Sequence, residues 1–153
     1  MNRFIVLLIF VVGVMATGIT IGTLTAPGAW YAALQKPAFN PPNWIFAPVW
    51  TVLYLMIAFV GWRIWDMQDR GPLMRLWSLQ MALNFLWSPV FFAAEMPVLA
   101  LVVILALLVV IILFIRAAFH PDRLSALLFL PYLSWVGFAS LLNGAIVLLN
   151  SGA

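Results

Sequence analysis

The sequence predicts an all-α, polytopic membrane protein: a bundle of five transmembrane helices that forms one domain over residues 1–153. Two observations support this fold class. Of the 153 residues, 67% are apolar and only 7% are charged, whereas about a quarter of the residues in an average soluble protein are charged. The few charges also divide the chain into five apolar runs, each near the ~20 residues that a helix needs to cross a bilayer. The predicted spans are 4–25, 43–65, 76–95, 97–117 and 124–149.

The composition also excludes several kinds of function. The chain contains no cysteine, which excludes disulfides and sites built on thiolates. Its net charge of +3 is spread thinly, without a basic run, so nucleic acid is excluded as a partner. The single histidine, His120, lies in a predicted loop close to Asp122 and Arg123. We therefore expect no metal site and no obligatory cofactor, and no nucleophile–base pair at an apolar pocket.

The first run, 4–25, has two interpretations. Arg3 and a tolerable cleavage site around Ala16 resemble the parts of a secretory signal peptide. However, the apolar character continues well past Ala16, beyond the roughly 7–15 residues of a signal-peptide core, which favours a retained span. Gly18 and Gly22 form a GxxxG motif, which permits close helix packing within one chain or between two chains.

The stretch 30–54 joins the first two runs and is unusually rich in proline and tryptophan. Three of its prolines precede Asn43, so this first half cannot be helical throughout. The second span is predicted to begin near Asn43, a good N-cap residue, with Pro48 within the first turn or so. A stiff aromatic loop suits a lid over an apolar ligand, but a membrane-interface belt of tryptophan and tyrosine explains the same residues.

The third run carries polar residues on one helical face. Gln80, Asn84, Trp87 and Ser88 recur at positions i, i+4, i+7 and i+8, and amides are costly in hydrocarbon, so this face is predicted to point into the bundle. Pro89 is predicted to kink the helix just beyond it. The amides could link helices by hydrogen bonds, or they could line a cavity.

The last two runs differ sharply. The fourth, 97–117, contains almost only apolar residues before its final arginine and is predicted to be a scaffold or lipid-facing helix. In the fifth, Tyr132, Trp135, Ala139 and Asn143 share one face. Helices with aromatic and amide faces that converge can form an apolar pocket with a few polar groups, although such faces also occur in ordinary helix cores.

Basic residues predict the orientation. With five spans, the N-terminus and the loops 63–75 and 116–123 lie on one side of the membrane. Six of the seven basic residues are there, and only Lys36 is on the other side. The positive-inside rule then places the N-terminus in the cytoplasm and the 30–43 loop outside. The six are Arg3, Arg63, Arg70, Arg75, Arg116 and Arg123. Three tryptophans near them are interpreted as an interfacial belt: Trp62, Trp65 and Trp77.

Three groups of residues share their spacing with one known family. The first is Trp30, Tyr31, Lys36, Pro37, Pro41, Pro42, Trp44, Phe46, Trp50, Thr51, Leu53 and Tyr54. The second is Gln80, Asn84, Trp87, Ser88, Phe91 and Phe92, and the third is Pro131, Tyr132, Leu133, Trp135, Ala139, Leu142 and Asn143. In these motifs the chain resembles the TspO/MBR family, the tryptophan-rich sensory proteins and translocator proteins, also called peripheral-type benzodiazepine receptors.

The resemblance implies a five-helix membrane bundle, often a homodimer, with a pocket under the first loop. That pocket binds porphyrins, such as protoporphyrin IX or haem, as ligands rather than obligatory cofactors, and also binds synthetic benzodiazepine-type compounds. The implied function is a receptor, sensor or transporter linked to tetrapyrrole homeostasis or stress signalling. Carried over by position, the ligand-binding residues are Tyr31, Pro41, Trp50, Asn84, Trp87, Trp135, Ala139 and Asn143.

The resemblance also implies an alternative function, and the chain departs from the family pattern in two respects. The alternative is an enzyme that degrades porphyrin with light and oxygen, in which Trp50 and Trp135 would be catalytic. The first departure concerns cholesterol, whose motif in animal members needs a tyrosine and a basic residue near the end of the fifth helix. Residues 142–153 contain neither, so specific cholesterol binding is not expected. The second is Val147, where many members carry an aromatic residue.

Overall fold

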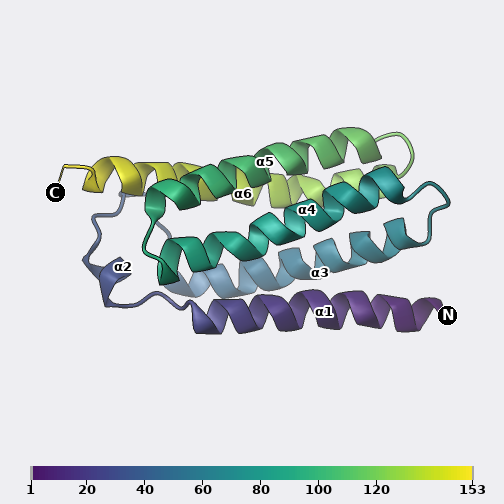
Figure 1. Cartoon of the computed structure of the whole chain (residues 1–153), viewed down its shortest axis with the longest axis horizontal. Helices are drawn as coiled ribbons and strands as arrows, with labels where there is room; N and C mark the ends of the chain where they lie inside the picture. The colour runs from purple at the N-terminus through teal and green to yellow at the C-terminus, as the bar shows by residue number, and fades with distance from the viewer. Residues whose placement is uncertain (1, 153) are drawn as a thin grey trace.

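The computed structural model describes residues 2–152, and all regular structure in this range is helical. The all-α prediction is therefore confirmed. Five long segments lie side by side along the molecule, with the N-terminus at one end and the C-terminus at the other (Figure 1). They are α1 (Arg3–Leu24), α3 (Phe46–Trp65), α4 (Gly71–Ser88), α5 (Pro97–Ala118) and α6 (Arg123–Asn150). Three short pieces complete the chain: α2 (Ala29–Ala33), the 3₁₀ turn η1 (Asn43–Ile45) and the π-helical turn η2 (Pro89–Ala93).

Four helical segments are long and apolar enough to cross a membrane: α1, η1 with α3, α5 and α6. Their described ends lie within one residue of the predicted ranges. The segment α4 falls outside this set, although it runs alongside the others (Figure 1). It begins at Gly71, five residues before the predicted start, with Pro72 in the first turn, where a missing backbone N–H is tolerated. This earlier start brings Arg75 into the helix and reduces its hydropathy.

At Pro89 the hydrogen-bonding pattern of the helix changes, but the helix does not end. The segment continues as the π turn η2, in which the Ala94 N–H donates to the Pro89 carbonyl over 2.8 Å. Proline lacks the N–H of a regular helical hydrogen bond, and π turns often occur where an α-helix is interrupted. The chain then reverses at Glu95, whose φ of 55° is positive, and enters α5 at Pro97.

The predicted capping role of Asn43 is wrong. Asn43 is the first residue of η1, and its side chain makes no capping hydrogen bond. The backbone closes this turn itself, because the Ile45 N–H donates to the Pro42 carbonyl over 3.0 Å. Pro48 lies in the first turn of α3, as predicted.

The loop before η1 is fastened to the end of α6. The Gln35 N–H donates to Asn150 Oδ1 over 3.1 Å, and Asn150 Nδ2 donates to the Gln35 carbonyl over 3.0 Å. Lys36 Nζ donates to the Leu34 carbonyl and lies 4.5 Å from the centre of the Tyr31 ring. The short helix α2 thus lies near the C-terminal end of the bundle (Figure 1).

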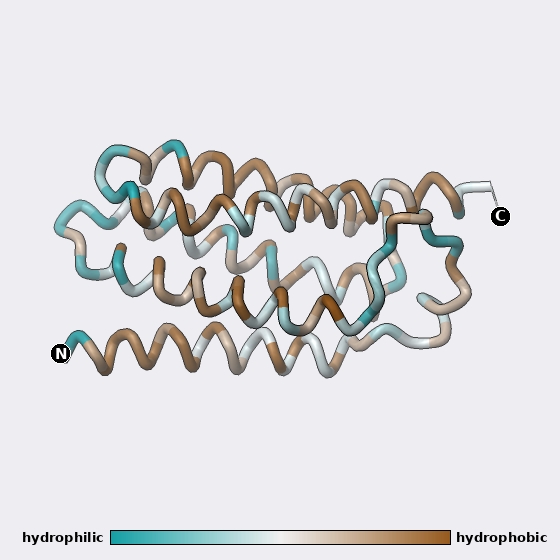
Figure 2. Tube along the Cα trace, turned by 180° about the vertical axis from the view of Figure 1, so that it is seen from behind, coloured by the Kyte–Doolittle hydropathy of each residue, from teal (hydrophilic) through white to brown (hydrophobic). Residues whose placement is uncertain are grey.

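Hydrophilic residues gather at the two ends of the bundle, and hydrophobic residues fill most of its length (Figure 2). At the N-terminal end, Arg63 forms an ion pair of 2.8 Å with Asp122, whose side chain also caps α6 at Ser125. Burial alone would raise the pKa of Asp122, but hydrogen bonds from Arg63 and Ser125 hold that pKa below its ordinary value. The Asp122 carboxylate is therefore an ionised link between α3 and α6.

One tryptophan of the predicted interfacial belt, Trp77, is half-buried and packs between helices. The Trp77 Nε1 atom donates to the Ile57 carbonyl over 3.0 Å, and the ring meets Phe10 edge-on at 5.3 Å. Gly61 leaves the space for this ring, because a Cβ there would lie 2.6 Å from it. Trp77 therefore joins α1, α3 and α4, a packing role that the belt interpretation does not include.

Candidate functional site

A cavity of about 520 Å³ lies among α1, α3, α4 and α6, and residues of the α1–α3 connection also line it. This volume is within the roughly 300–1,000 Å³ of small-molecule pockets. Among the residues that the structure describes, its lining contains no charged side chain. Aromatic rings and small or aliphatic groups make up most of the wall. The cavity therefore suits a large apolar ligand.

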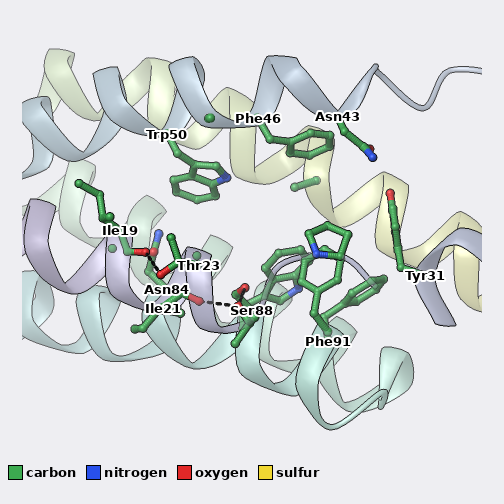
Figure 3. A pocket seen from close by; sticks show the side chains of 18 of the residues that line it. Ile19, Ile21, Thr23, Tyr31, Asn43, Phe46, Trp50, Asn84, Ser88 and Phe91 are labelled. Carbon is green, nitrogen blue, oxygen red and sulfur yellow. Dashed lines mark hydrogen bonds between the residues drawn. The ribbon is translucent and has the colours of Figure 1, made fainter. Parts of the chain in front are cut away.

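Aromatic rings form opposite walls of the cavity (Figure 3). On one side, Trp50 of α3 packs against Tyr54 with ring centres 5.2 Å apart. On the other, Trp87 of α4 stacks on Phe91 of η2 at 5.2 Å and 25°. Tyr31 closes one end (Figure 3), and burial raises the pKa of its phenol, which keeps it neutral. A flat ligand between these walls would meet ring faces on both sides.

Two roles are predicted for the amides of α4: linking helices by hydrogen bonds and lining a cavity. The hydrogen bonds of Gln80 and Asn84 distinguish between them. Asn84 accepts a hydrogen bond from the Tyr54 hydroxyl over 3.0 Å and donates to the Tyr132 hydroxyl over 2.7 Å. Tyr132 in turn donates to Gln80 Oε1 over 2.9 Å. Gln80 is fully buried and only links helices, whereas Asn84 links helices and also lines the cavity.

Three further hydrogen bonds involve residues that line the cavity. Asn143 of α6 accepts from Trp87 Nε1 over 3.1 Å and donates to the Pro97 carbonyl over 2.9 Å. The hydroxyl groups of Thr25 and Ser88 lie 2.6 Å apart. These polar groups already have partners within the protein. Asn40, another residue of the lining, has a buried amide oxygen without a hydrogen-bond partner. A ligand would therefore meet mainly aromatic and aliphatic groups, with this oxygen as a free acceptor.

Six of the eight predicted ligand-binding residues line this cavity. Two do not. Pro41 belongs to the loop but is absent from the wall, and Trp135 lines a separate space of about 20 Å³ behind Phe46 and Trp50. The Trp135 ring meets Phe46 edge-on at 5.7 Å, so it supports the wall from behind. The six residues in the wall are Tyr31, Trp50, Asn84, Trp87, Ala139 and Asn143.

The sequence reading missed the contribution of α1. Residues of its C-terminal half form one side of the cavity, and Ile19, Ile21 and Thr23 are visible there (Figure 3). The GxxxG motif was the available signal. Gly18 packs within the chain, since a Cβ there would lie 2.4 Å from the Tyr54 ring, whereas a Cβ at Gly22 would meet nothing within 4 Å.

Comparisons with known proteins give the family. The family model described as the TspO/MBR family matches residues 5–149. A "Tryptophan-rich protein TspO" from Archaeoglobus fulgidus is 42% identical over 145 residues, which cover 92% of this chain and 94% of the relative. Another from Chlorobaculum tepidum is 37% identical over 157 residues, with 98% and 99% coverage. The "Translocator protein" of Sus scrofa is 35% identical over 128 residues, with 80% and 76% coverage.

These matches extend over nearly the whole chain, and the helices long enough to cross a bilayer agree with them. The chain is an integral membrane protein and belongs to the TspO/MBR family.

Proposed function

We propose that this protein is a membrane receptor or sensor that binds a porphyrin in the cavity beneath the α1–α3 connection, and that it serves tetrapyrrole homeostasis, stress signalling or transport. The observation that carries the proposal is the pair of opposed aromatic walls, Trp50 with Tyr54 and Trp87 with Phe91, around a space without charged side chains. A porphyrin is large, flat and apolar over most of its surface. Ring contacts on both faces would stabilise it.

Iron is not needed for this mode of binding. Haem proteins fix iron through a histidine, methionine, cysteine or tyrosine. His120 lies in the α5–α6 turn at the opposite end of the bundle from α2 (Figure 1). Lys36 lies in the α1–α3 connection, where its Nζ atom donates to the Leu34 carbonyl. Within residues 2–152 it is the basic residue at this end of the bundle, and it would attract a porphyrin carboxylate there.

The test is a pair of titrations followed by tryptophan fluorescence. Metal-free protoporphyrin and haem are each added to the wild type and to His120→Ala in the dark. We expect quenching with affinities that agree within about threefold, a difference of less than ~1 kcal/mol. If neither compound quenches, the porphyrin proposal fails. If only haem binds and His120→Ala abolishes its binding, the iron-independent pocket is wrong.

The same samples test the alternative function, porphyrin breakdown by light and oxygen. The observation in its favour is that Trp50 lines both the main cavity and the small space that Trp135 also lines. One indole thus lies in the wall of the ligand site, and a second lines the small space behind that wall. Loss of porphyrin absorbance under illumination in air, but not under nitrogen or in Trp50→Phe, would support chemistry in addition to binding.

We further propose that α4 with η2 is the fifth membrane span. The segment runs from Gly71 to Ala93, or roughly 35 Å at 1.5 Å per residue, which is enough to cross the hydrocarbon core. Three of its polar residues are turned away from the lipid: Gln80 and Asn84 are buried, and Ser88 is bonded to Thr25. Arg75 and Ser78, nearer the start of the helix, are exposed. Its low hydropathy therefore follows both from Arg75 and from amides that serve the bundle interior.

Five spans place the α1–α3 connection opposite the N-terminus, and the basic residues favour a cytoplasmic N-terminus. The chain has no cysteine, so a thiol reagent labels only the cysteine introduced at a chosen position. Ala38 and Gln68 are both exposed, at opposite ends of the bundle. In intact cells we expect Ala38→Cys to react with an impermeant thiol reagent and Gln68→Cys to react only after lysis. The reverse pattern would refute this orientation.

A further inference from the structure

The turn between α5 and α6 carries two exposed arginines, Arg116 in the last turn of α5 and Arg123 at the start of α6. Within residues 2–152, neither of them forms an ion pair. The acidic residue in this turn is Asp122, and its carboxylate already accepts hydrogen bonds from Arg63 and Ser125. The positive charges of Arg116 and Arg123 are therefore not neutralised by the protein.

Phe119 contacts Arg123 and shares a helical face with Arg116. It follows Arg116 by three residues and keeps a helical backbone, with φ −57° and ψ −36°, so both side chains leave the same face. The guanidinium carbon of Arg123 lies 5.4 Å from the centre of the Phe119 ring. One guanidinium thus lies near a half-exposed ring, and Arg116 projects from the same helical face as that ring. We refer to these three residues as the arginine patch.

A continuous stripe of apolar side chains runs along α5 from the arginine patch. From Arg116 toward the start of α5, exposed aliphatic side chains recur at alternating intervals of four and three residues, which keeps them on one helical face. Each side chain in this stripe is 40–62% exposed. The stripe consists of Ile112, Val109, Leu105, Val102 and Val98. It follows α5 for most of the thickness of a bilayer.

We propose that the arginine patch is a binding site for an anionic phospholipid. Its phosphate is held by the guanidinium groups of Arg116 and Arg123, and one acyl chain lies along the stripe of α5. The planar fork of arginine suits phosphate oxygens, and the absence of a free carboxylate in the turn favours a lipid with net negative charge. A zwitterionic lipid brings its own cation, which the two arginines repel. This site is separate from the porphyrin cavity and does not depend on it.

The test uses the full-length protein in detergent and native mass spectrometry. Dioleoyl phosphatidylglycerol and dioleoyl phosphatidylcholine are titrated separately, so that only the headgroup differs. A basic residue near an anionic lipid surface contributes about fivefold in affinity. We expect the wild type to prefer phosphatidylglycerol by tenfold or more. We expect Arg116→Gln and Arg123→Gln each to lower that preference by about fivefold, and the double variant to abolish it.

Arg3→Gln is the matched control. It removes the same charge at the same end of the bundle (Figure 1), but Arg3 is already paired with Asp66 at 2.5 Å. Its preference for phosphatidylglycerol should remain within about twofold of the wild-type value. Equal affinities of the wild type for the two lipids would overturn the proposal. It would also be overturned if Arg3→Gln lowered the preference as much as Arg116→Gln, because net charge alone would then explain binding.

Discussion

Ala139→Leu should lower the affinity for metal-free protoporphyrin by about tenfold or more, which corresponds to at least ~1.4 kcal/mol. Ala139 is 8% exposed and lines both the main cavity and the small space behind Trp50. The additional carbons of leucine would occupy volume between Trp50 and Trp87 that the ligand needs. The affinity follows from tryptophan quenching in the dark, as for the wild type.

The control makes the same change on the lipid-facing side. Ala106 lies on α5, is exposed and does not line the cavity, so Ala106→Leu should bind porphyrin with wild-type affinity. Both variants should show the same helical content by circular dichroism. An unchanged affinity in Ala139→Leu, or an equal loss in Ala106→Leu, would exclude the cavity as the porphyrin site.

Because Trp135 lies outside the main cavity, we expect its substitution to have a smaller effect on porphyrin affinity. The sequence places Trp135 and Ala139 on one face and so predicts similar roles for them. In the structure Phe46 and Trp50 stand between the Trp135 ring and the main cavity. Trp135→Ala should therefore weaken binding less than Ala139→Leu does, by loosening the wall. Trp65→Ala, at the other end of the bundle, should leave the affinity unchanged.

The sequence predicts the helices and the inward polar faces well because both follow from solvation. Charged residues end a hydrocarbon span, and an amide inside it must face a partner. Gln80, Asn84 and Asn143 satisfy that rule with hydrogen bonds to neighbouring helices. The amides that satisfy this rule, together with Arg75, make α4 less apolar than the four segments long and apolar enough to cross a membrane.

What the sequence does not predict depends on packing between distant segments. The apolar face of α1 shows no preference for one partner, so its place in the cavity wall becomes apparent only when Gly18 is seen against Tyr54. Pro41 and Trp135 match the family motifs, yet spacing within one segment cannot indicate which ring stands in front of another. Backbone hydrogen bonding likewise closes the turn before α3, whereas the sequence predicts a capping hydrogen bond from the Asn43 side chain.

Tight packing around Gly61, at the other end of the bundle from the cavity loop, leads to the largest expected loss of stability. A Cβ atom at Gly61 would lie 2.6 Å from the Trp77 ring and 2.8 Å from Phe10. Trp77 cannot easily move aside, because its Nε1 atom donates to the Ile57 carbonyl. Gly61→Leu must therefore separate α3 from α1 and α4 or break that hydrogen bond.

Gly61→Leu is expected to destabilise the protein by about 3 kcal/mol, the upper end of typical overpacking costs, and to lower its Tm by roughly 6–12 °C. Thermal unfolding in detergent, followed by circular dichroism, measures the effect. The control is Gly13→Leu, since a Cβ at Gly13 in α1 meets nothing within 4 Å. Leucine there gains helix propensity of up to ~1 kcal/mol, so its Tm should stay the same or rise. Equal losses in both variants would show that glycine at position 61 is not required by the Trp77 ring.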